Sequence, residues 1–382
     1  MYTADSKQHY LILDGLRGVA ALMVIWYHIF EGFATSPLDQ KFNHGYLAVD
    51  FFFVLSGFVI GYAYDDRWGR MTVGGFFKRR LIRLHPMVIL GAVFGAAAFL
   101  LQGSVQWDGT YVGFAKVLVS MILAFFLIPC RPGGFCEVRG NGEMFPLNGP
   151  SWSLFFEYIA NIMYALFLRR LSTRCLKVFV AVSGLGYAAF AIFNGSGAYS
   201  MGVGWTLVGL NFLGGMLRVT FTFSCGLLLS RNFRPLKLQG AEISGNLAFW
   251  ACAAAIVGLL SVPYISVSSD GLQPCWLNGL YDAVCTLLIF PLLVLVGASA
   301  TFNDSGSRRI CSLLGEVSYP LYVIHYPVMY LFYAWVWKNG LTFSQAWPLA
   351  VGIFIGAPVL AYLCLKIYDL PVRRWLSRGQ KR

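Results

Sequence analysis

Two apolar stretches near the start of the chain decide the fold: RGVAALMVIWYHIFEGF at residues 17–33 and YLAVDFFFVLSGFVIGYAY at residues 46–64. Each is close to the roughly 20 residues that a helix needs to cross the hydrocarbon core of a bilayer. Neither stretch alternates apolar and polar residues, as a strand of a membrane barrel would. The two stretches therefore predict transmembrane helices.

The composition of the whole chain agrees with a membrane protein. Of the 382 residues, 58% are hydrophobic and only 12% are charged. A water-soluble domain of this size cannot cover so much apolar surface with so few charges, and a disordered or collagen-like chain is excluded as well. We expect an all-α polytopic bundle, one domain over 1–382, without a separate soluble domain. The ten predicted spans are 17–33, 46–64, 84–102, 152–168, 178–195, 204–229, 243–262, 279–300, 312–337 and 346–368.

The net charge of +12 reports membrane topology rather than nucleic-acid binding, because the basic residues cluster beside the apolar stretches. With a cytoplasmic N-terminus and ten spans, all but six of the 29 Lys and Arg lie in or beside cytoplasmic segments. There is an eleventh apolar stretch, 111–129. If it crossed the membrane, the later basic loops would lie on the outer side. We expect it to be re-entrant or to lie at the outer surface, with both termini cytoplasmic. The six exceptions are Lys41, Lys116, Arg131, Arg139, Arg218 and Lys338.

The longest outer segment, 103–151, contains Cys130 and Cys136. A disulfide between them is compatible with an oxidising outer compartment. Two free thiols are equally compatible, and Cys275 in a neighbouring outer loop is a competing partner.

Arg17 and His28 are the ionisable pair within the first span, and such groups inside a membrane mark functional sites. Their spacing places them on one face of a helix, about 16 Å apart along its axis. A fixed cation at the cytoplasmic end and a titratable base in the outer half suit an elongated anionic ligand that enters from the cytoplasm. A snorkelling Arg17 and a structural His28 are the simpler alternative.

A carboxylate beside an imidazole fixes its tautomer and raises its basicity, as general-base chemistry requires. Glu31 follows His28 by three residues and could reach it along the helix. Glu157 is the favoured candidate, because it lies deepest in its span. Asp50 and Asp282 lie near the starts of theirs, where solvated helix ends are the simpler account.

Arg80 and Arg83 lie three residues apart at the predicted start of the third span. Two arginines on one face there can bind phosphate oxygens, helped by the helix N-terminus. Simple positive-inside anchoring is the alternative.

Ser56 and Gly57 indicate first a close helix-packing contact and second a substrate contact. No metal-ligand or nucleotide-binding motif occurs, so no metal cofactor is expected.

Together these motifs resemble the bacterial integral-membrane acyltransferase family three, whose members move acetyl or other short acyl groups onto surface glycans, lipid-linked sugars and some metabolites. The matching blocks follow the family's order along nearly the whole chain. They are LDGLRG at 13–18 with the Arg17–His28 pair, VDFFFVLSGF at 49–58, Arg80-x-x-Arg83, WSLFFE at 152–157, GEVSYPLYVIH at 315–325 and YDLPVRR at 368–374. Asp369 stands where relatives often have Glu.

The resemblance implies roles for the residues in these blocks. His28 would be the essential base, and Arg17, Arg80 and Arg83 would bind a cytoplasmic acyl-CoA, by default acetyl-CoA. The outer part of the site would include Glu157, Ser318, Tyr319 and His325. Asp50, Ser56 and Trp152 are further candidate substrate contacts.

The sequence thus predicts a membrane O-acyltransferase of the bacterial inner membrane that acylates a hydroxyl of an extracytoplasmic or lipid-linked glycan. Its partners would be acyl-CoA, that glycan and membrane lipids, with no nucleic acid. Direct transfer and a relay through an acylated protein group are both open. A neutral His28 is needed either way, so activity should fall as the pH drops through its pKa. A transporter or flippase for a lipid-linked sugar, or a structural membrane partner, is the alternative.

Overall fold

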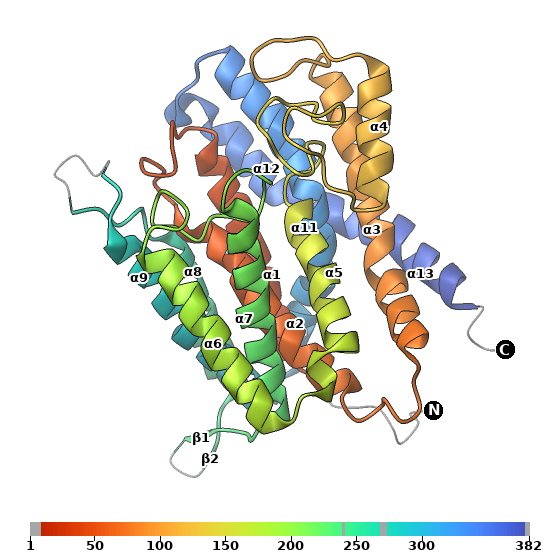
Figure 1. The fold of residues 1–382 in the computed structure, drawn as a ribbon, viewed down its shortest axis with the longest axis vertical. Helices are drawn as coiled ribbons and strands as arrows, with labels where there is room; N and C mark the ends of the chain where they lie inside the picture. Colours follow the sequence, from red (N-terminus) through yellow and green to blue (C-terminus); the bar gives the residue numbers. More distant parts are fainter. Residues whose placement is uncertain (1–8, 239–240, 268–272, 379–382) are drawn as a thin grey trace.

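The computed structural model describes residues 9–238, 241–267 and 273–378, and Figure 1 shows them as a bundle of long helices. A helix occupies each of the ten predicted spans, which confirms the all-α polytopic fold. These helices are α1 (Leu11–Glu31), α2 (Ala48–Tyr64), α3 (Val73–Leu101), α5 (Ser151–Leu166), α6 (Thr173–Ile192), α7 (Asn211–Arg231), α8 (Gly245–Ser261), α9 (Trp276–Val284) with α10 (Phe290–Ser299), α11 (Ser305–Lys338), and α12 (Phe343–Cys364) with α13 (Leu370–Ser377). The strands in the described part form one small hairpin, β1 (Lys237–Leu238) and β2 (Ala241–Glu242).

Eight of these helical segments are long and apolar enough to cross a membrane. The two others are α8, with 17 residues, and α11, with 34 residues and many tyrosines that lower its hydropathy. Both pack against α1 and belong to the same bundle. A short 3-10 turn, His44–Leu47, leads into α2, and another, Leu168–Arg170, follows α5.

The stretch 111–129 does not cross the bundle, as predicted. It forms α4 (Phe114–Phe125), whose 12 residues extend about 18 Å, too short for a hydrocarbon core of about 30 Å. Its inner face packs Val117 against Phe99 of α3, while Phe114 and Ile122 are exposed. In Figure 1, α4 lies at the end of the bundle opposite the β1–β2 hairpin.

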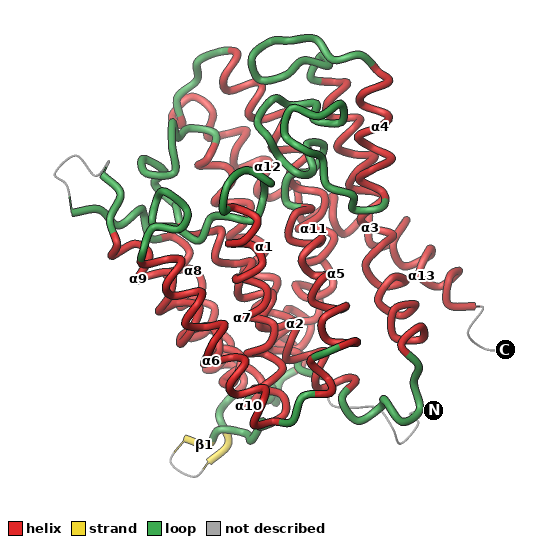
Figure 2. The backbone as a smooth tube through the Cα atoms, in the orientation of Figure 1, coloured by secondary structure: helices red, strands yellow, loops and turns green. Residues whose placement is uncertain are grey.

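The two ends of the bundle differ in their loops. Figure 2 shows that the long irregular segments gather at the end that carries α4, whereas the connections at the other end are short. The basic clusters at 78–83, 169–177 and 231–237 adjoin the end with the short connections. Its assignment as the cytoplasmic end stays a prediction of the charge pattern.

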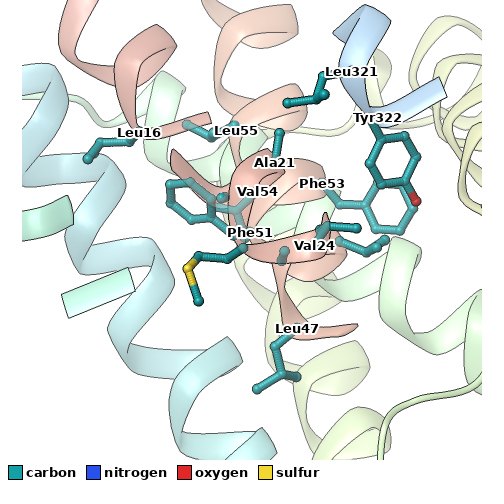
Figure 3. Close-up of a cluster of buried hydrophobic side chains, with 14 of the residues drawn as sticks. Leu16, Ala21, Val24, Leu47, Phe51, Phe53, Val54, Leu55, Leu321 and Tyr322 are labelled. Carbon is teal, nitrogen blue, oxygen red and sulfur yellow. The ribbon is translucent and has the colours of Figure 1, made fainter. Parts of the chain in front are cut away.

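The helices of the bundle pack closely where small residues meet. A Cβ on Gly57 of α2 would lie 2.0 Å from the Phe223 carbonyl oxygen of α7, and a Cβ on Gly226 would lie 2.0 Å from the Val54 carbonyl oxygen. The helix-packing interpretation of Gly57 is therefore confirmed. Figure 3 shows the apolar side chains around α1, α2 and α11 that fill the interior, among them Leu16.

Cys130 and Cys136 are free thiols in the structure. The Cys130 thiol donates a hydrogen bond to the Cys136 carbonyl oxygen, with Sγ and O 3.3 Å apart. Cys275 is also free and buried.

Candidate active site

A cavity of about 260 Å³ lies in the half of the bundle near α4, between α1, α11 and the irregular segment 141–150. Four ionisable side chains line it: His28, Glu31, Glu143 and Arg218. Most of the remaining wall is aromatic. The aromatic lining consists of Tyr27, Tyr46, Trp107, Trp152, Trp205, Tyr322, Tyr326, Tyr330, Tyr333 and Trp337.

Helix periodicity explains why so many of these side chains meet. On α11 the lining residues between positions 322 and 337 follow one another at intervals of three or four. The lining residues of α1 are Val24, Tyr27, His28 and Glu31, and each lies three or four residues from another member, so each set shares one helix face. The two helices pack side by side, and their polar faces enclose the cavity.

His28 and Glu31 form a hydrogen-bonded pair on the α1 face. The His28 Nδ1 atom lies 2.7 Å from the Glu31 Oε2 atom, and the Tyr333 hydroxyl donates to the same oxygen at 2.8 Å. A carboxylate can only accept, so the network assigns the imidazole proton to Nδ1. The Nε2 atom then carries a lone pair, as a general base that faces the cavity requires.

His325 of α11 lies next to this pair, as the sequence predicts. The ring centroids of His28 and His325 are 5.4 Å apart. The His325 Nδ1 atom donates to the Tyr322 carbonyl oxygen at 2.8 Å, and its buried Nε2 atom has no hydrogen-bond partner among the described residues. His325 does not line the cavity itself.

Glu157 is not the carboxylate beside His28, contrary to the expectation from its depth in the span. Its Oε1 atom accepts hydrogen bonds from the Ser56 hydroxyl at 2.7 Å and from Arg80 Nη2 at 2.8 Å. Depth along a helix does not determine which neighbouring helix a side chain faces, and α5 turns Glu157 toward α2 and α3. The partner of His28 is Glu31, the nearest acidic residue along its own helix.

Asp50 is paired with Arg218, and both side chains are 0% exposed. Arg218 Nη2 lies 2.7 Å from Asp50 Oδ2, Nε contacts both carboxyl oxygens, and the guanidinium also donates to the Tyr46 carbonyl oxygen. The guanidinium lies 4.9 Å from the ring centroid of Trp152, which lines the cavity. Arg218 lines the cavity, and its ion pair with Asp50 fixes its position. Asp50 does not line the cavity itself.

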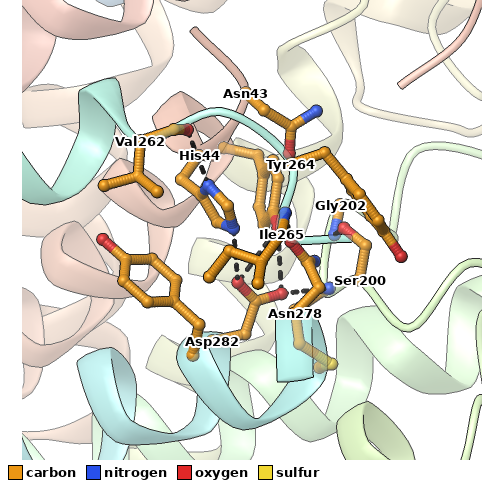
Figure 4. A network of polar contacts seen from close by, with 12 residues as sticks. Asn43, His44, Ser200, Gly202, Val262, Tyr264, Ile265, Asn278 and Asp282 are labelled. Atoms are coloured by element: carbon orange, nitrogen blue, oxygen red, sulfur yellow. Dashed lines mark hydrogen bonds and ion pairs between the residues drawn. The ribbon is translucent and has the colours of Figure 1, made fainter. Parts of the chain in front are cut away.

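Asp282 is fully buried as well, so the expectation of solvated helix ends is wrong for both aspartates. Figure 4 shows its carboxyl group within a polar network. It accepts a hydrogen bond from the Tyr46 hydroxyl at 2.9 Å and one from the Met201 backbone N–H at 2.7 Å, and His44 Nε2 lies 3.6 Å away. Because Tyr46 lines the cavity, this network fixes part of the cavity wall.

A second polar region lies toward the basic end of the bundle. Arg17 pairs with Asp14 at 2.8 Å and donates from Nε to the Ser318 hydroxyl at 2.8 Å. Arg83 is exposed and has no hydrogen bond or ion pair with any residue in the described ranges. The charges of Arg80 and Arg17 act on it. The structure thus brings the three predicted arginines together.

Arg373 of α13 belongs to the same region, and the sequence analysis did not single it out. Its charge acts on Arg83, and Arg373 Nε donates to Asp369 Oδ1 at 2.8 Å. The signal was available, because Asp369 and Arg373 are four residues apart in the block at 368–374. We call Arg17, Arg80, Arg83 and Arg373 the arginine cluster.

Ser318 and Tyr319 lie beside the arginine cluster and not in the outer part of the site where they were expected. Ser318 bonds Arg17, and the Tyr319 hydroxyl donates to the Leu84 carbonyl oxygen at 2.5 Å. Seven residues separate Ser318 from His325, which is about 10 Å along a helix. Residues of one sequence block, 315–325, therefore lie at two different depths of the bundle, and the sequence does not show this.

Glu143 and Arg218 are the charged cavity residues that the sequence analysis did not name as site residues, and most of the aromatic lining was missed as well. Glu143 lies in the irregular segment before α5 and accepts a hydrogen bond from the Tyr330 hydroxyl at 2.5 Å. Burial raises the pKa of Glu143 to about 7. No periodic pattern marks this segment, so its fold could not be anticipated. No group of three or more potential metal ligands occurs in the part of the chain that the structure describes.

The comparisons with known proteins agree with this arrangement. Residues 10–366 match the family described as "Acyltransferase domain", which is acyltransferase family three. The chain belongs to this family. Its members are acyltransferases, so the expected enzyme class is confirmed, and the helices described above make it an integral membrane protein.

Curated relatives cover different parts of the chain. "Protein 2 in picA locus" of Rhizobium radiobacter is 34% identical over 47% of this chain and 92% of its own length. "Putative O-acetyltransferase SACOL0978" of Staphylococcus aureus (strain COL) is 27% identical over 86% of this chain, which spans about half the length of that relative. "Acyltransferase MdmB" of Streptomyces mycarofaciens is 24% identical over 96% of this chain and 92% of its own length. No solved structure matches.

Proposed function

We propose that the protein is a membrane O-acyltransferase that moves an acetyl or other short acyl group from cytoplasmic acyl-CoA to a sugar hydroxyl. The observation that carries the proposal is His28: its Nδ1 atom is bonded to Glu31 while the ring lines an aromatic cavity. The family match and the names of the Staphylococcus aureus and Streptomyces mycarofaciens relatives support the reaction class. The membrane would be the cytoplasmic (inner) membrane of a bacterium.

The arginine cluster would bind the donor. The phosphates of acyl-CoA are anionic, and guanidinium groups bind phosphate oxygens in pairs. Arg83 is exposed and unpaired among the described residues, so it is the member most available to a ligand. The thin pantetheine arm would then extend along α1 toward His28, about 16 Å beyond Arg17.

In direct transfer, His28 Nε2 accepts the proton of the acceptor hydroxyl. The hydroxyl oxygen forms a bond to the thioester carbonyl carbon, the C–S bond breaks, and the CoA thiolate leaves and takes the proton from His28. Glu31 keeps the proton of the imidazole on Nδ1 and stabilises the imidazolium that forms in between. A relay in which the acyl group rests first on His28 uses the same residues.

The acceptor would be an extracytoplasmic or lipid-linked glycan. The cavity lies at the end of the bundle opposite the basic clusters, and aromatic rings that line it suit the apolar faces of sugars. Ser56 donates a hydrogen bond to Glu157, and Glu157 pairs with Arg80, so both would act through Arg80 as positioning residues for the donor.

Acetyl-CoA turnover by the purified full chain in detergent, with and without a glycan extract of the host, tests the proposal. Wild-type protein should release CoA, the extract should stimulate the release, and His28→Ala should lower the rate by on the order of 10²–10⁴-fold. His85→Gln is the matched control, because His85 is a part-buried histidine of α3 that does not line the cavity.

Two results would contradict the proposal. Equal turnover by wild type and His28→Ala would remove His28 from the reaction. Failure of the wild-type protein to bind or consume acetyl-CoA or a longer acyl-CoA would remove the donor, and transport of a lipid-linked sugar would then become the better account.

A further inference from the structure

Glu143 lines the cavity from a part of the chain that the proposed chemistry does not use. His28 and Glu31 come from α1, whereas Glu143 comes from the irregular segment before α5. A row of tyrosines connects the two sides: the ring of Tyr326 lies 4.7 Å from that of His28 and 4.6 Å from that of Tyr330, whose hydroxyl bonds Glu143. Glu143 and the base therefore face the same cavity from opposite ends of this row.

The segment that carries Glu143 is built around a buried arginine. The Arg139 guanidinium lies 3.3 Å from the centroid of the Tyr330 ring, and Arg139 Nε donates to the Pro146 carbonyl oxygen at 2.6 Å. Glu137 accepts hydrogen bonds from the backbone N–H groups of Arg139 and Gly140. These contacts hold the segment in place, and the Arg139 charge acts on Glu143. Glu143 is thus fixed in position while its carboxyl group faces the cavity.

The charges in the cavity disfavour an anionic ligand. Two carboxyl groups, Glu31 and Glu143, face it, and their charges act on each other. The cation of the wall, Arg218, is already paired with Asp50. A phosphate or carboxylate on the ligand would meet two acidic groups and no unpaired guanidinium. Hydroxyl groups, by contrast, can donate to a carboxylate.

The shape of the cavity favours a single ring. Its volume of about 260 Å³ lies just below the range of roughly 300–1,000 Å³ that is typical of ligand sites. Trp107, Trp152, Trp205 and Trp337 contribute flat apolar faces to the wall. A sugar ring has an apolar face for such rings and hydroxyl groups at its rim for the carboxyl groups.

We propose that Glu143 accepts a hydrogen bond from a hydroxyl of the acceptor sugar, and that the cavity selects one uncharged sugar ring over a ring that carries a carboxylate or phosphate. The inference rests on the proposed function only in identifying this sugar as the acceptor. Glu143 then determines specificity, and His28 acts on a different hydroxyl of the same ring.

Sugar binding by the purified full chain tests this without any donor. The probes are methyl hexosides of the gluco, galacto and manno configurations and the matched methyl hexuronides, followed by saturation-transfer difference NMR. The wild type should bind at least one hexoside at least tenfold more tightly than its hexuronide. Glu143→Gln, which keeps the shape of the side chain, should weaken hexoside binding at least tenfold and reduce the discrimination against the hexuronide.

Glu137→Gln is the matched control from the same segment. It does not line the cavity, and its amide oxygen can still accept both backbone hydrogen bonds, so hexoside binding should stay within twofold of wild type. Acetyl-CoA binding should be unchanged in Glu143→Gln and in Glu137→Gln. Unchanged binding would show that both variants fold. If Glu143→Gln does not fold, Glu143→Asp, which withdraws the carboxyl group from the ring, should show the same tenfold loss.

Three outcomes would overturn the inference: no hexoside binds, the hexuronide binds as tightly as the hexoside, or Glu143→Gln leaves hexoside binding unchanged. Failure of wild-type protein to bind acetyl-CoA would overturn the proposed function instead, while the sugar measurements would still decide the role of Glu143.

Discussion

The arginine cluster and the aromatic cavity are two polar regions of the bundle, and their charges are paired in different ways. The cavity contains one cation, Arg218, and Asp50 neutralises it completely. The cluster contains four guanidinium groups, and Arg83 has no partner in the described part of the chain. An exposed guanidinium without a protein partner is available to pair with the phosphate of a ligand. The difference supports the proposals that the cluster receives an anionic donor and the cavity an uncharged acceptor.

Between the two regions lies an apolar layer. Side chains such as Ala21, Val54 and Leu321 pack there around α1, α2 and α11 (Figure 3). The pantetheine arm of the donor would have to pass through this layer to reach His28. A thin chain can do so more easily than a solvated sugar.

Loss of Arg218 should have the largest effect on stability. Arg218→Met leaves Asp50 buried and unpaired, which costs about 3–5 kcal/mol. The thermal unfolding temperature in detergent should fall sharply. Lys366→Met removes a cation from the exposed pair with Glu316 and should cost less than about 1 kcal/mol. Equal losses in the two variants would mean that the Asp50–Arg218 pair is not buried in the way described.

Loss of the Glu31 carboxylate should affect the rate rather than the fold. Glu31→Gln leaves an amide beside His28 Nδ1, which neither fixes the tautomer nor stabilises the imidazolium. The kcat for acetyl transfer should fall by on the order of 10²–10⁴-fold, with acetyl-CoA binding unchanged. Glu157→Gln should instead weaken acetyl-CoA binding, because Glu157 holds Arg80. A larger loss of kcat in Glu157→Gln than in Glu31→Gln would restore Glu157 as the catalytic carboxylate.

Substitutions of Arg83 and Arg80 should have the smallest effects of the series. Comparing them should distinguish an effect on acetyl-CoA binding from an effect on stability. Arg83→Gln breaks no hydrogen bond within the described residues, so the unfolding temperature should stay constant while the Kd for acetyl-CoA rises by about 10–100-fold, the worth of one or two charge-assisted contacts. Arg80→Gln breaks the pair with Glu157 and should lower both stability and affinity. An Arg83→Gln variant with unchanged affinity would exclude Arg83 from the donor site.

The sequence predicts the bundle well because the signal of a span is local. Each run of about 20 apolar residues indicates a helix by itself, and the charge pattern is enough to show that 111–129 does not cross. The Arg17–His28 spacing likewise depends on a single helix. For this reason the separation of Arg17 from His28 is predictable without the packing, whereas the division of the block 315–325 between the two levels is not.

The pairing of side chains across helices is what the sequence conceals. Asp50 and Arg218 are 168 residues apart, and Glu157 meets Arg80 and Ser56 from two other helices. Which faces meet depends on the packing of the whole bundle. Glu143 was invisible for a further reason: its segment has no helix or strand period, and its place depends on the stacking of Arg139 on Tyr330.

The central claim is that donor and acceptor enter from opposite ends, and vectorial transfer in proteoliposomes tests it most directly. Cys175 is exposed near the basic end, whereas the other eight cysteines are buried or half-buried, so a membrane-impermeant maleimide reports the orientation of the protein. With acetyl-CoA on the Cys175 side and a methyl hexoside on the other, acetylated hexoside should form on the hexoside side. Product that forms only when acetyl-CoA is supplied on the side opposite Cys175 would contradict the account.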